Sequence, residues 1–211
     1  MKTDDLIRGL AADTRRERSL ESGLARALGI GLAGAVALFA LILSPRAGMP
    51  GLMMEPRILL KFIVTLSLAA TSIWLALRLV RPGADARPLV WALAIPAGAL
   101  MLGVVTELVV TPLQGWMPGL FGHSAIYCLS LVTLMAAPVL VSALYALKRG
   151  APEHPMLAGA AGGALAGSLG AALYALHCVD DSPLFVLVWY GIAIGFVTAA
   201  GALIGRRVLS W

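Results

Sequence analysis

The stretch that decides the fold is residues 124–147, SAIYCLSLVTLMAAPVLVSALYAL, which contains no charged side chain. The hydrocarbon core of a bilayer is about 30 Å thick, and a helix of roughly 20 apolar residues spans it. The stretch lacks the strict alternation of apolar and polar residues that marks a membrane β-strand. Because lipid offers no hydrogen-bond partners to the backbone, the stretch predicts a membrane-spanning α-helix.

Five further apolar stretches repeat this pattern and predict spans at residues 27–43, 58–80, 89–110, 156–176 and 184–204. The composition agrees, since 60% of the 211 residues are hydrophobic, only 13% are charged, and the mean hydropathy is +0.90. Soluble domains average about 25% charged residues, so a soluble globular fold is excluded. We therefore predict an all-α polytopic membrane protein with six transmembrane helices and too little remaining chain for a separate catalytic domain.

The positions of lysine and arginine predict the orientation of these helices. Most of them lie in the N-terminal tail, the second and fourth loops and the C-terminal tail, whereas Arg46, Arg57 and Lys61 lie on the other side. Cytoplasmic loops carry the excess of basic residues, so both termini are expected in the cytoplasm. The net charge of +5 is then a sign of topology, and we expect no direct contact with nucleic acid.

The chain is expected to divide into a cytoplasmic N-terminal segment (1–26), a transmembrane bundle (27–205) and a short cytoplasmic C-terminal tail (206–211). The first segment has good helix-starting residues followed by apolar residues at helical spacing. These are Thr3, Asp4 and Asp5, then Leu6, Ile7, Leu10 and Ala11. Because so short a helix is marginal in water, it is expected either to dock into a partner's groove or to lie on the membrane surface.

Chemically reactive side chains collect at the predicted outer end of the bundle. His123 and Cys128 begin the fourth span, and Glu107 lies near the outer end of the third, at the interface or paired with histidine or metal. His177, Cys178, Asp180 and Asp181 close the fifth span and fill the loop after it. The residues alone leave three interpretations open: a metal site with thiolate and imidazole ligands, a disulfide in an oxidising compartment, or two buried apolar cysteines.

Glycines at four-residue spacing predict close helix packing in the last two spans. The fifth span carries Gly159, Gly163 and Gly167, with Gly162 and Gly170 beside them, and the sixth carries the pairs Gly191/Gly195 and Gly201/Gly205. Such faces let helix backbones approach closely in membranes, either within one chain or between protomers.

Two other functional classes were weighed against the sequence. A small transporter would carry ionisable groups near the bilayer midplane, whereas Lys61, Arg78 and Glu107 all lie near span ends. A membrane thiol oxidoreductase needs a reactive cysteine pair and a resolving pair, whereas this chain has two separated cysteines. No catalytic motif stands out, so we do not expect an enzyme.

Three stretches together resemble the NrsF family. They are MKTDDLI at residues 1–7; FGHS at 121–124 with Cys128 and AAP at 136–138; and LHCVDDSPLF at 176–185 with WY at 189–190. NrsF proteins are six-span inner-membrane anti-sigma factors of proteobacteria that hold extracytoplasmic-function sigma factors of the SigF type. The resemblance extends over essentially the whole chain.

The resemblance implies roles for both ends of the bundle. The N-terminal segment, including Asp4, Asp5, Leu6 and Ile7, would bind the sigma factor and keep it from RNA polymerase. Cys128 and Cys178 would respond to heavy metals or oxidants, as metal ligands or as a redox pair. The expected supporting residues are His123, His177, Asp180 and Asp181. The expected partners are the sigma factor and the lipid bilayer, with no small-molecule substrate. No cofactor is expected to be required, and a heavy-metal ion would act only as the signal. The oligomeric state is left open.

Overall fold

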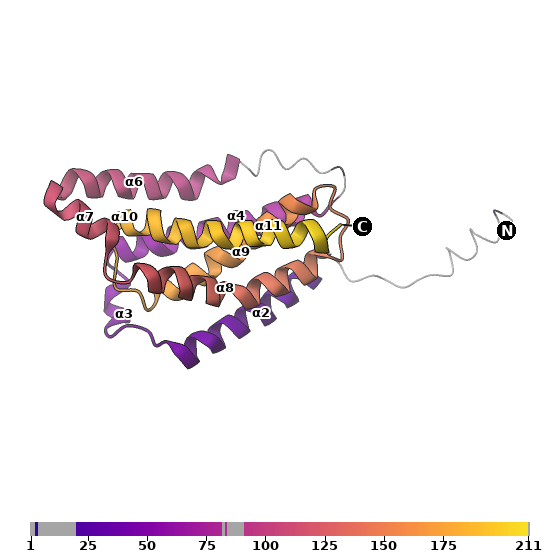
Figure 1. Cartoon of the computed structure of the whole chain (residues 1–211), viewed down its shortest axis with the longest axis horizontal. Helices are drawn as coiled ribbons and strands as arrows, with labels where there is room; N and C mark the ends of the chain where they lie inside the picture. Colours follow the sequence, from indigo (N-terminus) through magenta and orange to yellow (C-terminus); the bar gives the residue numbers. More distant parts are fainter. Residues whose placement is uncertain (1–2, 4–19, 82, 84–90, 211) are drawn as a thin grey trace.

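The computed structural model describes residue 3, residues 20–81, residue 83 and residues 91–210. Within this part of the chain every regular element is a helix (Figure 1). Five helical stretches are long and apolar enough to cross a membrane. They are α2 (Leu20–Ile42), α4 (Pro56–Leu79), α8 (Ala125–Leu147), α9 (Pro155–Ala175), and the continuous run of α10 (Pro183–Phe185), the π-helix η1 (Val186–Tyr190) and α11 (Gly191–Val208). The predicted all-α architecture is thereby confirmed for the described residues, and five of its helical stretches have the length and composition of membrane spans.

The third predicted span is shorter than expected. Within residues 89–110 the long helix is α6 (Ala94–Val110), which has 17 residues. At 1.5 Å per residue it is about 25 Å long, less than the hydrocarbon core of about 30 Å. Helix length therefore supports five spans in the described chain, and the sixth stays a prediction. Two shorter helices, α3 (Met49–Leu52) and α7 (Leu113–Phe121), connect the long ones at one end of the bundle.

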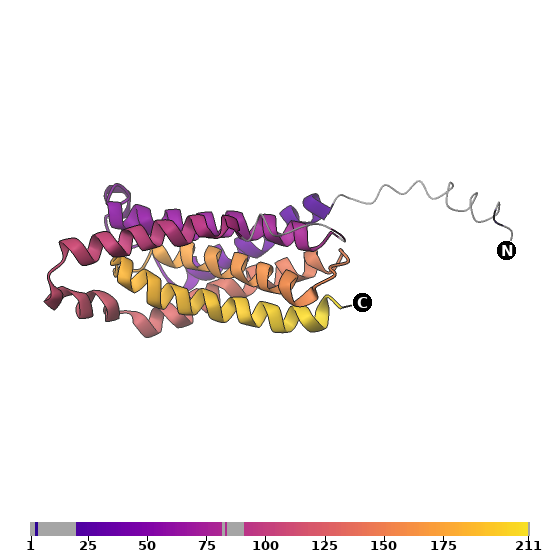
Figure 2. The same ribbon diagram turned by 90° about the horizontal axis from the view of Figure 1, so that it is seen from above.

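Helix α9 is the centre of the bundle, packed between α11, α8 and α4 (Figures 1 and 2). Two thirds of its span is buried, against 39% or less for the other four. Its glycines allow this position, because a Cβ atom at Gly163 would lie 2.6 Å from the carbonyl oxygen of Val197 on α11. A Cβ at Gly170 would similarly lie 2.8 Å from the carbonyl oxygen of Val132 on α8.

The glycine prediction is therefore confirmed for the fifth span and in part for the sixth. Gly201 and Gly205 each face the backbone of Gly159, with hypothetical Cβ contacts of 2.5 and 2.6 Å. In contrast, no atom of the described residues lies within 4 Å of a Cβ built on Gly191 or Gly195. These two glycines do not contribute to close packing within the described part of the chain.

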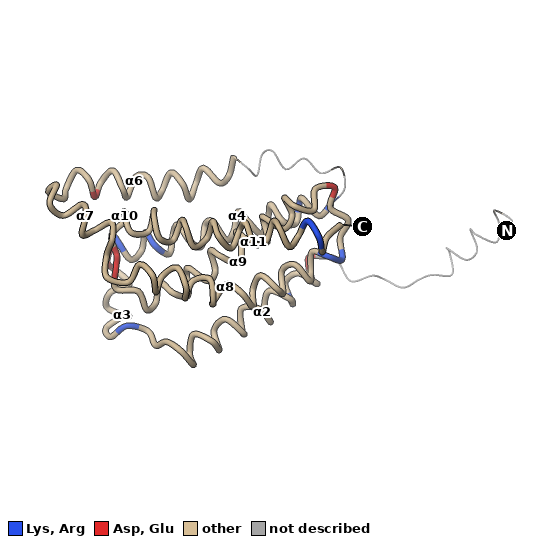
Figure 3. Tube along the Cα trace, in the orientation of Figure 1, with Lys and Arg blue, Asp and Glu red and all other residues tan. Residues whose placement is uncertain are grey.

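Basic residues separate between the two ends of the bundle as the sequence suggested (Figure 3). The start of α2 and the end of α11 lie at the same end. That end holds the described basic residues Arg26, Arg78, Arg81, Lys148, Arg149, Arg206 and Arg207. The opposite end holds Arg46, Arg57 and Lys61.

Candidate functional site

The loop between α9 and α10 forms the centre of the candidate site. Helix α9 ends in a tight turn, in which the N–H groups of His177 and Cys178 both donate to the carbonyl oxygen of Tyr174 at 2.9 Å. The next helix begins at Pro183, and the Ser182 hydroxyl caps it by accepting from the N–H of Leu184. Residues 176–182, here called the sensor loop after the role that the family resemblance implies for Cys178, are therefore fixed at both ends.

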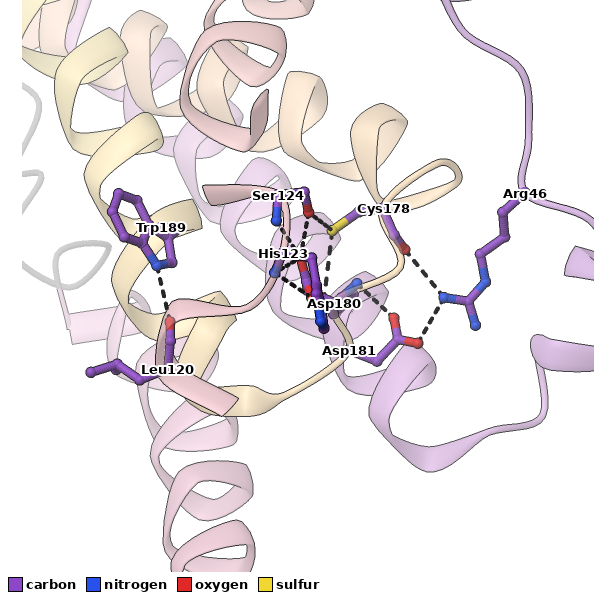
Figure 4. Close-up of polar contacts among 9 residues, drawn as sticks. Arg46, Leu120, His123, Ser124, Cys178, Asp180, Asp181 and Trp189 are labelled. Carbon is purple, nitrogen blue, oxygen red and sulfur yellow. Dashed lines mark hydrogen bonds and ion pairs between the residues drawn. The ribbon is translucent and has the colours of Figure 1, made fainter. Parts of the chain in front are cut away.

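Asp180 anchors the sensor loop to the start of α8 (Figure 4). Its carboxylate accepts hydrogen bonds from the N–H groups of His123 and Ser124 at 3.1 and 2.9 Å, and from the Ser124 hydroxyl. Burial acts to raise the pKa of Asp180, but the hydrogen bonds from Ser124 and His123 outweigh it and hold that pKa below its usual value. A negative charge at this helix N-terminus is also favoured by the helix dipole.

A glycine makes this anchoring possible. Gly122 ends α7 with a φ of +54°, in the left-handed region that a side chain disfavours. A Cβ atom there would lie 2.7 Å from Cγ of Asp180 and 2.7 Å from the ring of Phe185. The turn between α7 and α8 therefore depends on the absence of a side chain at this position.

Asp181, which follows Asp180 in the sensor loop, forms ion pairs with two basic side chains from other elements. Its carboxylate lies 2.7 Å from Nζ of Lys61 on α4 and 2.8 Å from Nη1 of Arg46, which precedes α3. The Lys61 side chain is fully buried, and its Nζ also lies 5.8 Å from the centre of the Tyr190 ring. An ammonium group at this depth depends on its ion pair, because an unpaired buried charge is very costly.

Both predicted cysteines are buried free thiols. Cys178 donates to the carbonyl oxygen of Asp180 at 3.7 Å and lies 3.9 Å from the Ser124 hydroxyl. Cys128 is completely buried one turn into α8 and belongs to the same apolar cluster as Cys178, together with Tyr174, Phe185 and Tyr190. The structure thus brings both thiols to one region of the bundle, on neighbouring elements.

A cavity of about 410 Å³ reaches Cys178 from the side of the bundle. Its walls come from the end of α2, the start of α8 and the end of α9, and they include Leu43, Tyr127 and His177. Cys128 is not part of its lining. Of the two cysteines, Cys178 is therefore the one that lines this cavity, and this residue is 2% exposed.

The supporting histidines occupy different surroundings. The Nδ1 atom of His123 lies 3.3 Å from Oδ1 of Asp180, although its side chain is 91% exposed. The Nδ1 atom of His177 instead lies 2.7 Å from the carbonyl oxygen of Ser44. Among the described residues no group of three His, Cys, Asp or Glu side chains is arranged to hold a metal ion.

Glu107 pairs with arginine, a partner that the sequence did not suggest. Its carboxylate lies 2.7 Å from Nη2 of Arg57 at the start of α4, and it accepts a 3.5 Å hydrogen bond from Ser182 of the sensor loop.

A further contact joins α7 to the last span, where the indole of Trp189 donates to the carbonyl oxygen of Leu120 at 3.0 Å (Figure 4).

Arg46, Lys61 and Ser124 were not predicted as site residues. The two cations were used to assign orientation, Lys61 also to argue against a transporter, and Ser124 stood only within a family motif. The available signal was a lysine inside an otherwise apolar span, since such a residue needs a partner. Of the predicted sigma-binding residues only Thr3 is described, as exposed helix. Asp4, Asp5, Leu6, Ile7 and Leu10 lie outside the described residues.

Comparison with known proteins identifies similar regulators. Residues 10–211 match the family model NrsF, described as a negative regulator of sigma F. The chain is 34% identical to a probable anti-sigma-F factor NrsF from Azospira oryzae and 32% identical to the anti-sigma-F factor NrsF from Caulobacter vibrioides. Both alignments cover all of this chain and all of the relative. No solved structure matches the chain.

Proposed function

This chain belongs to the NrsF family, and from that premise we propose that it is a non-enzymatic membrane anti-sigma factor that holds a sigma factor of the extracytoplasmic-function type. The observation that carries the proposal is the full-length similarity to two anti-sigma-F factors. Their names are those of transcription regulators, which favours regulation over the transporter and oxidoreductase alternatives.

The proposed topology has six spans and two cytoplasmic termini in the bacterial inner membrane. The segregation of basic residues to the end where α2 begins supports this orientation. Helix α6 would complete the set of six as the third span in chain order. It runs beside α4 and exposes apolar side chains such as Leu102 (70%) and Val109 (79%). A bilayer accommodates a span shorter than its hydrocarbon core by thinning locally around it.

The N-terminal segment is the proposed sigma-binding element. Residues 3–10 combine helix-starting acids with an apolar face, a pattern suited to docking in a groove of the partner. They precede α2 in the sequence, and α2 begins at the basic end of the bundle, which is the cytoplasmic end in the proposed topology. The family model itself begins at residue 10, so the role of this segment depends on direct measurement.

Cys178 is the proposed point of entry for the signal, because Cys178 lines the cavity beside it and Cys128 does not. A peroxide could accept two electrons from the pair: one thiolate attacks the O–O bond, the second displaces water from the sulfenic acid, and a disulfide, an alcohol and water result. A soft metal cation could instead replace the two thiol protons and bind both sulfurs. Either product changes how the sensor loop packs on α8.

The proposed coupling from the cysteines to the tail runs through α2. Arg46, which follows α2, binds the sensor loop at three points. Its N–H donates to the carbonyl oxygen of Leu176 at 3.0 Å, and its guanidinium contacts the carbonyl oxygen of Cys178 at 3.3 Å and the carboxylate of Asp181. A rearranged sensor loop would favour a different position of α2, and the signal acts by its differential affinity for the two arrangements.

Co-purification of the sigma factor from membranes tests the sigma-binding segment. We expect the wild-type chain to retain the sigma factor and the variant D4A/L6A/I7A to lose at least about 90% of it, since docking depends on the apolar face. D13A, in the same segment but outside residues 3–10, is the matched control and should retain it. Equal retention by the triple variant would show that the segment does not bind the sigma factor.

A further inference from the structure

A groove between α2 and α8 is a second candidate binding site, on the side of the bundle and away from the sensor loop. It has a volume of about 780 Å³. Glycines of α2 form its floor: a Cβ atom at Gly31 would lie 2.9 Å from the carbonyl oxygen of Pro138, and one at Gly34 would lie 3.3 Å from the Pro138 ring. The two helices therefore contact along the floor, and larger side chains form the walls.

The groove opens toward the surface that would face lipid. Ile30 on α2 and Val141 on α8 line it and are 74% and 69% exposed. Both helices are long and apolar enough to cross a membrane, so their exposed apolar side chains are expected to contact acyl chains. A hydrocarbon chain lying in the groove would cover apolar wall that the protein leaves open.

The charges of the groove are confined to one end. Arg26 of α2 and Arg149, just after α8, both line it. The guanidinium of Arg149 lies 5.5 Å from the centre of the Tyr145 ring and reaches across to Gly23, one turn before Arg26. No carboxylate of the described residues forms an ion pair with either arginine.

From this arrangement we infer that the groove binds an anionic phospholipid. The two guanidinium groups would hold the phosphate headgroup, since arginine forms forked hydrogen bonds with phosphate, and one acyl chain would lie between α2 and α8. Basic pockets between membrane helices are suited to such headgroups. The inference does not depend on the sigma factor or on the cysteines.

Because α2 follows directly from the N-terminal segment, a lipid in this groove would also hold the base of the tail against α8. This is a consequence of position: Gly23 and Arg26 lie within the first two turns of α2. The groove is thus a site through which membrane composition could affect the N-terminal segment.

Native mass spectrometry of the delipidated full-length protein tests the inference. We expect phosphatidylglycerol to bind at least about tenfold more tightly than phosphatidylcholine with the same acyl chains. The variant R26Q/R149Q should lose this preference. The matched control is R206Q/R207Q, which removes two exposed arginines at the same end of the bundle but outside the groove, and it should keep the preference.

Each other result would overturn the inference. Equal binding of the two lipids, an unchanged preference in R26Q/R149Q, or an equal loss in R206Q/R207Q would show that the groove does not select the headgroup. Displacement by millimolar inorganic phosphate would assign the arginines to a free anion. Dimers that R26Q/R149Q abolishes would assign the groove to a second copy of the chain. If R26Q/R149Q does not fold, V141W fills the groove with both arginines intact, and it must weaken phosphatidylglycerol binding.

Discussion

Removing the charge of Asp181 should destabilise the bundle far more than removing the charge of Lys61. Lys61 is fully buried, and its only ion pair among the described residues is with Asp181 at 2.7 Å. Asp181→Asn therefore leaves a buried ammonium group without a counter-ion, at a cost of about 3 kcal/mol. Lys61→Met has a smaller expected cost, about 1 kcal/mol, because Asp181 is partly exposed and retains Arg46.

The assay is thermal unfolding of the purified protein in detergent, followed by circular dichroism. For a chain of this size about 1 kcal/mol shifts the midpoint by about 2–4 °C, so D181N should lower it by about 6–12 °C and K61M by about 2–4 °C. The double variant K61M/D181N should be less destabilised than D181N, since the buried ammonium group is gone and only Arg46, whose side chain is 17% exposed, lacks its carboxylate. If D181N lowers the midpoint no more than K61M does, Lys61 does not depend on Asp181 and the ion-pair argument is wrong.

Three further predictions concern packing, pH and the anchor of α8. Gly163→Leu should lower the unfolding midpoint strongly because its side chain meets the α11 backbone, whereas Gly195→Ala, which meets nothing, should leave it unchanged or raise it. Asp180→Asn should lower the unfolding midpoint at pH 7, and the difference in midpoint from the wild type should shrink as pH falls below about 4. The reason is that the pKa of Asp180 is lower in the folded state than in the unfolded state. The ionised carboxylate therefore stabilises the fold above its unfolded-state pKa, and this stabilisation is lost as pH falls through its folded-state pKa. A difference that is constant down to pH 2 would contradict that pKa shift. Ser124→Ala should cost about 1 kcal/mol by removing the hydroxyl donor to Asp180, measured by the same unfolding assay with Ser130→Ala on the exposed face of α8 as control.

The helices were predictable because lipid permits few alternatives for a long apolar stretch. Residues 124–147 predicted α8 to within one residue, since backbone groups in a bilayer must be paired within the segment. The length of α6 was not predictable in the same way, because apolar residues precede Ala94 without being part of the long helix. Composition specifies that a segment is apolar, whereas packing and turns decide where its helix begins.

The candidate site was predictable as a region but not as a network. The sequence placed Cys178, Asp180 and Asp181 at one end of the bundle, and the structure agrees. It gave no sign that Asp181 pairs with Lys61, because these residues are 120 positions apart and no local pattern links them. The glycines show the same limit: Gly191/Gly195 and Gly201/Gly205 have identical spacing, yet only the second pair faces α9, since helix rotation is set by tertiary packing.

The central claim is that the chain holds a sigma factor and releases it when Cys178 reacts. The most direct test measures the fraction of sigma factor bound to membranes before and after organic hydroperoxide or a soft metal cation is added. We expect release from the wild-type chain, no release from C178S or from C128S/C178S, and normal release from the control S130A. Release from C178S to the same extent as from the wild type would contradict it.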